Sequence, residues 1–351
     1  MKKRVCLIGH LGGNATYLDG QTVKTKTLYR ELCEATDWEL HCVDTALRRR
    51  RPVRLLFSTL WNLLRCKDVF VLLSTNGVRV YFPLLYFFAK LRGTRVYHDV
   101  IGGWLPELVT EHPRFRKYIG AFRVNWVETE RLCSRLRDAG LTNVRLLPNF
   151  KRLTPASPEG WTPWREKPYR FCTFSRVMQE KGIEDAIAAV EELNAQTGKT
   201  LCTLEIYGAV DEGYRERFDR CMAQTTDAVH YGGAIPFDRS TEVVGGCFAL
   251  LFPTHFTSEG VPGTIVDAFF AGVPVIASDI SCNAELVAHL ENGLLYPSAQ
   301  AQNLTEAMRW LIAHPQEAFA MKARCLQSAE RYRPEANLPA MIALVEGGEA
   351  K

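Results

Sequence analysis

The stretch SEGVPGTIVDAFFAGVPVIASDI, residues 258–280, gives the clearest succession of turn, helix and strand signals in the chain. The apolar run 248–253 before it predicts a buried strand, and residues 264–271 predict a helix that ends at Gly272. Residues 274–277 predict the next strand. This order is typical of a parallel α/β sheet, in which ligands bind at the carboxyl ends of the strands.

Two carboxylates, Glu259 and Asp267, flank the turn in this stretch. Glu259 precedes the turn and occupies no helix-cap position. We therefore expect an unpaired loop carboxylate that binds hydroxyl groups beside Gly260 and Gly263, where a ligand can approach the backbone closely. Asp267 has two interpretations: it binds the ligand, or it forms a variant capping box with Thr264 and complements the helix dipole.

Alternating strands and helices extend in both directions from this stretch, and at 351 residues the chain exceeds the usual size of a single core. Residues 151–168 contain four prolines and predict a linker. The expected fold class is α/β, with two Rossmann-like domains, 1–150 and 169–334, facing across a cleft. The last segment, 335–351, is expected to return to the first domain as a helix. The predicted strands are 4–9, 38–44, 68–74, 94–101, 122–128 and 143–148, then 169–175, 203–208, 228–233, 248–253, 274–278 and 293–297.

The composition, with 47% hydrophobic and 23% charged residues, is that of an ordinary globular protein. The eleven cysteines show no CxxC pair and lie in apolar segments, so we expect buried thiols in a reducing compartment and no zinc site. No apolar run approaches 18 residues, and the amino-terminal apolar segment is too short for a signal peptide. These features predict a cytoplasmic protein that does not span a membrane.

Charge is unevenly distributed between the two halves. Residues 1–150 hold 25 Lys and Arg against 13 Asp and Glu, whereas the remainder holds 18 against 26. Much of the positive charge accompanies apolar residues in 48–67 and 79–93. These segments are either two core-facing helices with solvated charges or basic amphipathic segments that lie on an anionic membrane surface. Four consecutive arginines at 48–51 favour the membrane, and nucleic acid is not expected because no binding motif accompanies the charge.

Cationic and glycine-rich loops follow the first predicted strand of each domain. Arg176 follows the strand 169–175, and Lys181 precedes a helix, which is typical of an anion site, although a solvated charged loop has the same pattern. Gly12 and Gly13 lie between a strand and a helix expected near Thr22, where a phosphate or sugar could approach. The loop lacks the GxGxxG spacing of a dinucleotide-binding fold.

Taken together, these motifs resemble one family. The Arg176 and Lys181 pair, the 259–267 run, GVPVIAS (272–278) and the GGN loop (12–14) look like a family 4 retaining glycosyltransferase of GT-B fold. The resemblance covers nearly the whole chain and is stronger in the second domain. The segments DGQTVKTKTLYREL (19–32), IGGWLPEL (101–108) and SDISCNAELV (278–287) look most like bacterial enzymes that build capsule, exopolysaccharide or O-antigen units.

The resemblance implies transfer of a sugar from a nucleotide-diphosphate donor to a lipid-linked saccharide, with retention of configuration and without a metal or other cofactor. It implies that the first domain binds the acceptor at the inner face of the plasma membrane. Arg176 and Lys181 would hold the diphosphate and stabilise the leaving group, and Glu259 would hold donor-sugar hydroxyls. The remaining implied donor-binding residues are Gly12 and Gly13 at the phosphate across the cleft, Gly260, Val261, Pro262, Gly263 and Thr264 at the sugar, Asp267 at the ribose, and Gly232 and Ala234 near the base.

Two positions depart from the family pattern. The second acidic position is usually Glu, and Asp267 is one methylene shorter, so its ribose contact would be longer or mediated by water. Many relatives place a His after the fourth strand, whereas His98 and Asp99 lie inside it; they are candidates on the acceptor side or satisfied core residues. Alternative functions are a nucleotide-sugar epimerase and a non-catalytic GT-B scaffold subunit.

Overall fold

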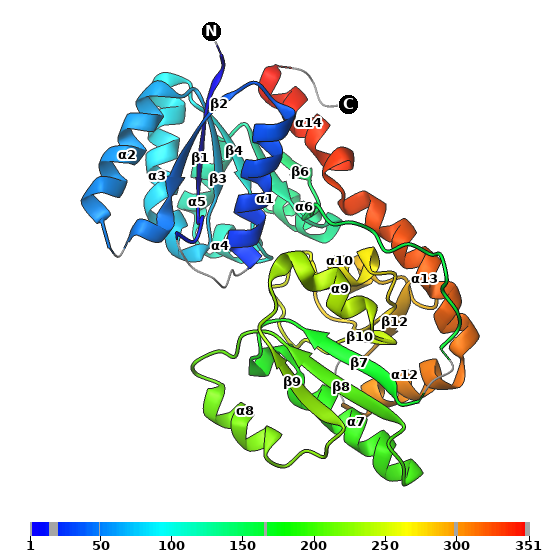
Figure 1. Cartoon of the computed structure of the whole chain (residues 1–351). Helices are drawn as coiled ribbons and strands as arrows, with labels where there is room; N and C mark the ends of the chain where they lie inside the picture. Colours follow the sequence, from blue (N-terminus) through cyan, green and yellow to red (C-terminus); the bar gives the residue numbers. More distant parts are fainter. Residues whose placement is uncertain (1, 14–19, 49, 165–166, 298–300, 348–351) are drawn as a thin grey trace. The chain divides into compact units, whose positions relative to one another are not determined.

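A computed structural model describes residues 2–13, 20–48, 50–164, 167–297 and 301–347 (Figure 1). The chain divides into two compact units. Unit 1 contains residues 1–152 and 331–351, and unit 2 contains residues 153–330. Each unit is built around one parallel six-stranded sheet.

In unit 1 the strand order is β2-β1-β3-β4-β5-β6, and every neighbouring pair is parallel. The chain reverses its direction of travel between β1 and β3, which is therefore the topological switch point of this sheet. The elements are β1 (Arg4–Gly9), α1 (Gly20–Ala35), β2 (Glu39–Asp44), η1 (Thr45–Arg48), α2 (Pro52–Arg65), β3 (Asp68–Leu72), α3 (Thr75–Arg92), β4 (Arg95–Asp99), α4 (Leu105–Glu111), α5 (Pro113–Gly120), β5 (Val124–Val127), α6 (Glu130–Asp138), β6 (Val144–Leu146) and α14 (Pro334–Glu346).

The core of unit 1 includes the C-terminal helix. Leu338, Met341 and Leu344 of α14 pack with Val5 of β1 and Leu28 of α1 in one apolar cluster, and Figure 1 shows α14 in red beside α1. The expected return of the last helix to the first domain is therefore confirmed.

Ion pairs of Arg152, the last residue of unit 1 before unit 2 begins, also hold α14 in place. The Arg152 guanidinium donates from Nε to Glu31 on α1 at 2.6 Å and from Nη1 to Glu335 on α14 at 2.9 Å. Together with the apolar contacts, these bonds explain why residues 331–351 belong to unit 1 although they follow the whole of unit 2 in sequence.

In unit 2 the strand order is β12-β11-β10-β7-β8-β9, again parallel throughout. From β7 the chain proceeds outward through β8 and β9, and from β10 it proceeds in the opposite direction through β11 and β12, so the switch point lies between β7 and β10. The elements are β7 (Tyr169–Phe174), η2 (Gln179–Lys181), α7 (Ile183–Thr197), β8 (Cys202–Tyr207), α8 (Arg215–Met222), β9 (Val229–Gly233), η3 (Phe237–Arg239), α9 (Ser240–Gly245), β10 (Ala249–Phe252), α10 (Gly263–Phe270), β11 (Val275–Ser278), α11 (Asn283–Leu286), β12 (Gly293–Tyr296), α12 (Ala301–Ala313), α13 (Pro315–Ala329) and η4 (Glu330–Tyr332), which runs into unit 1.

All twelve predicted strands are present, most of them one to three residues shorter than the apolar runs that predicted them. The helix expected at 264–271 is α10, displaced by one residue. Eight of the eleven cysteines are buried, as expected. Within the described residues, no helix combines the length and apolar character needed to cross a bilayer.

Candidate functional site

The residues predicted for ligand binding in unit 2 gather at the carboxyl ends of the strands around its switch point. Arg176 and Lys181 follow β7, and Glu259 follows β10, the strand hydrogen-bonded to β7. In open α/β sheets, the loops on the two sides of a switch point diverge and leave a crevice between them.

Lys181 and Glu259 form an ion pair between their ammonium and carboxylate groups. Their side chains are only 16% and 13% exposed. The aromatic rings of Phe252 and Phe256 lie 5.6 and 5.4 Å from the Lys181 ammonium, close enough for cation–π attraction. The prediction that Glu259 is an unpaired loop carboxylate is therefore wrong, because its carboxylate is paired with Lys181 of the neighbouring loop.

Hydrogen bonds to backbone carbonyls connect the loops that carry Lys181 and Glu259. The N–H of His255 donates to the carbonyl of Glu180 at 2.7 Å, and the Thr254 hydroxyl donates to the same carbonyl at 3.2 Å. On the far side, the Ser281 hydroxyl donates to the Glu259 carbonyl at 3.0 Å. Because these hydrogen bonds connect the loops, the Lys181–Glu259 pair does not rest on two independent loops.

Gly182 allows this close approach. It adopts a left-handed conformation with φ of 68°, and a Cβ atom there would lie 2.0 Å from the carbonyl oxygen of Pro253 at the end of β10. No other residue satisfies both conditions without moving the backbone. The glycine that begins α7 therefore fixes the separation of the loops that carry Lys181 and Glu259.

Arg176 lies at the same edge of the sheet but is more open to solvent. Its side chain is 45% exposed, and its Nη1 lies 3.9 Å from the Asp211 carboxylate, beyond β8. A contact at this distance between exposed groups contributes little to stability. The guanidinium can therefore leave Asp211 and bind another anion at little cost in free energy.

The turn after Glu259 is largely buried. Gly260, Val261 and Pro262 are buried, and Gly263 begins α10. The N-cap residue of α10 is Pro262, which has no side-chain cap, so Asp267 lies in the second turn, beyond the position of a capping-box acid. This excludes the variant capping box of Thr264 and Asp267.

Asp267 and Thr264 are both buried on α10, Asp267 with only 3% exposure. The Thr264 hydroxyl has no hydrogen-bond partner among the described residues. A buried hydroxyl without a partner costs free energy, which a bound ligand could recover. One polar atom of the predicted donor-binding turn, the Thr264 hydroxyl oxygen, therefore lacks a hydrogen-bond partner among the described residues.

Gly232 and Ala234, predicted near the base, are exposed at the end of β9. A Cβ atom at Gly232 would lie 2.2 Å from the Tyr207 ring on β8, so this ring and the Gly232 backbone are in close contact. These positions share the strand-end edge of the sheet with Arg176, two strands from β7.

In unit 1, the loop containing Gly12 and Gly13 follows β1 at the switch point of its sheet. The backbone N–H groups of Leu11 and Gly13 donate to the Asp44 carboxylate at 2.9 and 3.3 Å. Asp44, at the end of β2, was not among the predicted residues. A carboxylate at the end of a predicted strand was the sequence feature that could have identified it. In this conformation the Gly13 N–H is directed to protein, not to a phosphate; residue 14 of the GGN motif lies outside the described residues.

His98 lies in β4 and is fully buried. Its Nδ1 is 2.9 Å from the Asn125 side-chain oxygen, and the Phe82 and Phe122 rings pack edge-on against it. Burial lowers the pKa of the imidazole to about 4. His98 therefore lies in the core, as one interpretation expected, but it is not a satisfied core residue, because its Nε2 has no hydrogen-bond partner among the described residues.

Asp99, also buried in β4, belongs to a charge cluster that sequence did not predict. The Lys24 ammonium lies 2.7 Å from both Asp99 and Glu128 and donates to the Val100 carbonyl at 2.8 Å. Burial raises the pKa of Asp99 to about 6, although Lys24 opposes the shift. Burial alone would lower the pKa of Lys24, but the two carboxylates outweigh it and raise that pKa.

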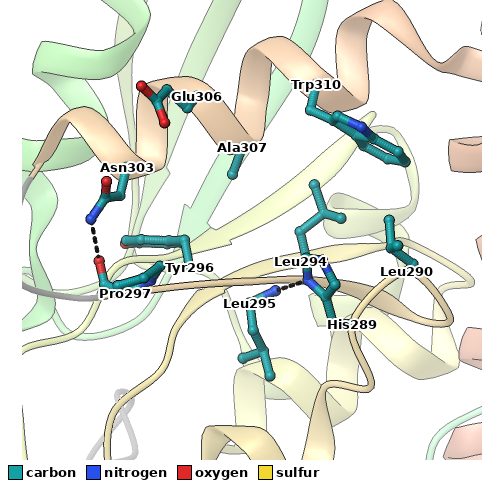
Figure 2. A pocket seen from close by; sticks show the side chains of 10 residues that line it. All are labelled: His289, Leu290, Leu294, Leu295, Tyr296, Pro297, Asn303, Glu306, Ala307 and Trp310. Carbon is teal, nitrogen blue, oxygen red and sulfur yellow. Dashed lines mark hydrogen bonds between the residues drawn. The ribbon is translucent and has the colours of Figure 1, made fainter.

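A pocket of about 250 Å³ also occurs in unit 2, between β12 and α12 (Figure 2). Leu294, Tyr296 and Trp310 line it, and the His289 imidazole accepts the N–H of Leu295 at 3.1 Å. None of the predicted site residues lines this pocket. Lys181 and Glu259 therefore do not contribute to this pocket.

Comparison with known proteins identifies the second half of the chain. The model of the family "Glycosyl transferases group 1" matches residues 161–330, which include all of the strand-end residues of unit 2 described above. This match covers just under half of the chain, and these residues are similar to the group 1 glycosyltransferases. The family resemblance predicted from the motifs is confirmed for this part of the chain.

Individual relatives of this glycosyltransferase domain are distant. The chain is 32% identical over 94 residues to D-rhamnosyltransferase WbpZ of Pseudomonas aeruginosa, covering 26% of this chain and 25% of that protein. It is 27% identical over 142 residues to the amylovoran biosynthesis glycosyltransferase AmsK of Erwinia amylovora, covering 39% and 34%. The matched stretches thus span about a quarter to a third of these relatives.

Solved structures of similar fold cover the whole chain. Anabaena HepE in complex with UDP aligns over 98% of this chain and 100% of its own, with a TM-score of 0.72 and 15% identity. Sucrose-phosphate synthase from Thermosynechococcus elongatus aligns over 99% of both chains, with a TM-score of 0.75 and 16% identity. The chain has the GT-B fold, and both Rossmann-like domains that sequence predicted are present.

Proposed function

We propose that this protein is a retaining glycosyltransferase that moves a sugar from a nucleotide-diphosphate donor to a lipid-linked saccharide during surface polysaccharide synthesis. The Lys181–Glu259 ion pair carries the proposal. It places a cation for the diphosphate and a carboxylate for sugar hydroxyls together at a switch point within a group 1 glycosyltransferase domain.

The charged residues at this edge would divide the work of transfer. As the glycosidic bond to the donor diphosphate breaks, negative charge grows on the leaving group, and Lys181 and Arg176 stabilise it. This is the electrostatic role that a divalent metal performs in other enzymes, so we expect metal-independent activity. Glu259 accepts hydrogen bonds from sugar hydroxyls, and Asp267 binds the ribose.

Retention of configuration is the proposed stereochemical course, with the donor phosphate accepting the proton of the attacking hydroxyl. The positions of His98 and Asp99 support a mechanism without a protein base. His98 is fully buried against Asn125, and Asp99 is ion-paired with Lys24. We also propose that the protein works at the cytoplasmic face of the plasma membrane, where a lipid-linked acceptor resides.

The test is incubation of the purified protein with UDP-, GDP- and dTDP-sugars, with and without a chelator, while free nucleotide and the sugar product are measured. Release of nucleoside diphosphate that the chelator leaves unchanged supports the proposal, and NMR of the product anomeric proton reports retention or inversion. Isomerised sugar with intact nucleotide would indicate an epimerase instead. Absence of both binding and turnover for every donor would favour a non-catalytic scaffold.

A further inference from the structure

Helix α2 exposes a row of large apolar side chains to solvent. Leu56, Phe57 and Trp61 are 55%, 69% and 61% exposed, and Val53 and Leu64 continue the same face at helical spacing. The opposite face packs against the protein through Leu55, Leu63, Thr59 and Asn62, which are buried. A helix that packs only against its own domain has polar residues on its outer face, so the apolar outer face of α2 is built to be covered.

Helix α3 extends this face. It lies beside α2 in Figure 1, and two hydrogen bonds join the helices: the Thr59 hydroxyl is 3.3 Å from the Tyr81 hydroxyl, and Arg92 donates to the Leu64 carbonyl at 2.9 Å. Of the eleven large apolar side chains that are exposed in the described residues, eight lie on these two helices. We call these eight the apolar face: Val53, Leu56, Phe57, Trp61, Leu64, Val80, Phe87 and Leu91.

The two helices and the loops that flank them carry almost only positive charge. Residues 45–94 contain ten Lys and Arg but a single acidic residue, Asp68. Asp68 is buried and accepts hydrogen bonds from Arg95 and Tyr97, so it does not neutralise the surface. Arg48, Arg50, Arg51 and Arg54 are exposed at the start of α2, and the Arg65 guanidinium lies 5.4 Å from the Trp61 ring at its end.

We infer that the apolar face docks on the surface of an anionic lipid bilayer, with the aromatic and aliphatic side chains among the acyl chains and the arginines at the headgroups. Exposed Trp, Phe and Leu bordered by Arg are what an interfacial helix requires. A second copy of this chain fits the face poorly, because a symmetric contact would bring two sets of arginines together. The inference rests on the proposed membrane location but not on the transfer chemistry.

The test measures binding of the whole protein to vesicles of phosphatidylcholine with and without phosphatidylglycerol, at low and high salt. Phe57→Ser/Trp61→Ser removes the two most exposed aromatic side chains of α2, and Arg50→Gln/Arg54→Gln removes charge. Leu290→Asn is the matched control, because Leu290 is an apolar side chain in unit 2 with 51% exposure and a left-handed backbone that Asn tolerates.

The expected result is binding to phosphatidylglycerol vesicles that falls about tenfold or more in the aromatic variant and is unchanged by Leu290→Asn. The arginine variant should lose affinity mainly at low salt, because salt screens its contribution. Brominated lipids should quench the fluorescence of the wild-type protein more strongly than that of Trp61→Phe.

Absence of vesicle binding by the wild type, or an equal loss in the Leu290 control, would overturn the inference. So would a wild-type dimer in sedimentation velocity that the aromatic variant dissociates, since a second copy would then cover the face. The thermal shift that nucleotide sugars cause in the same variants separates the two proposals. A variant that keeps this thermal shift but no longer binds vesicles has lost membrane docking alone.

Discussion

The Lys181 ammonium and the Glu259 carboxylate, 78 positions apart in sequence, are in direct contact where β7 and β10 end. In the absence of a donor, each group compensates the charge of the other and stays in place. A donor diphosphate would attract Lys181, and sugar hydroxyls would occupy Glu259. Under the proposed function, the ion pair therefore keeps both groups oriented until a donor separates them.

Replacing either partner should remove turnover without unfolding the protein. We expect Lys181→Ala and Glu259→Ala each to lower kcat/KM about 100-fold or more, since each removes a group aimed at the reacting part of the donor. Nucleotide release from the preferred donor measures the loss, and circular dichroism verifies the fold. A near-normal rate in either variant would contradict the site assignment.

Stability should respond to the same residues in a coupled way. Lys181→Met or Glu259→Gln alone leaves a mostly buried partner unsatisfied and should cost about 1–3 kcal/mol of unfolding free energy. The double variant should be more stable than the sum of the single changes predicts. The exposed pair Arg239 and Glu242 is the control, with a coupling energy below about 0.5 kcal/mol expected. Equal coupling in both pairs, measured by urea denaturation, would refute the interpretation.

Sequence predicted the strands because each is a short apolar run bounded by glycine, proline or polar residues. It also placed Lys181 and Glu259 at one edge of the sheet. It did not predict that their side chains touch, because the separation of the two loops is set by tertiary contacts, and Glu259 therefore appeared unpaired. The buried Lys24 cluster was missed for the same reason: its charges come from three elements, and charged residues in a strand or helix are usually expected at the surface.

Asp267 shows how the helix start decides between two interpretations. With Pro262 at the N-cap, Asp267 is too far into α10 to cap it, and ligand binding by Asp267 stays a prediction. Asp267→Asn keeps the size of this buried side chain and should weaken donor nucleotide binding about tenfold, measured by calorimetry. Asp227→Asn, at an exposed turn, should leave affinity unchanged. Unaltered binding by Asp267→Asn would return Asp267 to a structural role.

His98 should make the protein less stable in acid. Because burial lowers its pKa from 6.5 to about 4, the folded state binds the proton less readily than the unfolded state. The contribution of neutral His98 to the free energy of unfolding is fully present above pH 6.5. It decreases by about 3 kcal/mol as the pH falls toward 4. The raised pKa of Asp99 acts oppositely, since its contribution is lost as the pH rises from 3.8 to about 6.

The two effects overlap, so a difference measurement is needed to separate them. His98→Gln preserves a hydrogen-bonding side chain beside Asn125 but does not titrate. The stability of the wild type minus that of His98→Gln should decrease between pH 7 and pH 4, measured by denaturant unfolding at each pH. A constant difference would mean that His98 is protonated equally in the folded and unfolded states.

Gly182 and Gly198 form a matched pair that tests whether the spacing of β7 and β10 loops matters for the site. Both are left-handed, with φ of 68° and 62°, at the two ends of α7. Alanine at Gly198 meets no atom within 4 Å and should cost only the backbone preference, about 1 kcal/mol. Alanine at Gly182 places Cβ 2.0 Å from the Pro253 carbonyl oxygen and must push the end of β10 away from Lys181. We expect Gly182→Ala to lose more stability than Gly198→Ala and to weaken donor binding, which Gly198→Ala should preserve. Equal thermal midpoints and donor affinities in the two variants would show that the close approach at Gly182 does not position the ion pair.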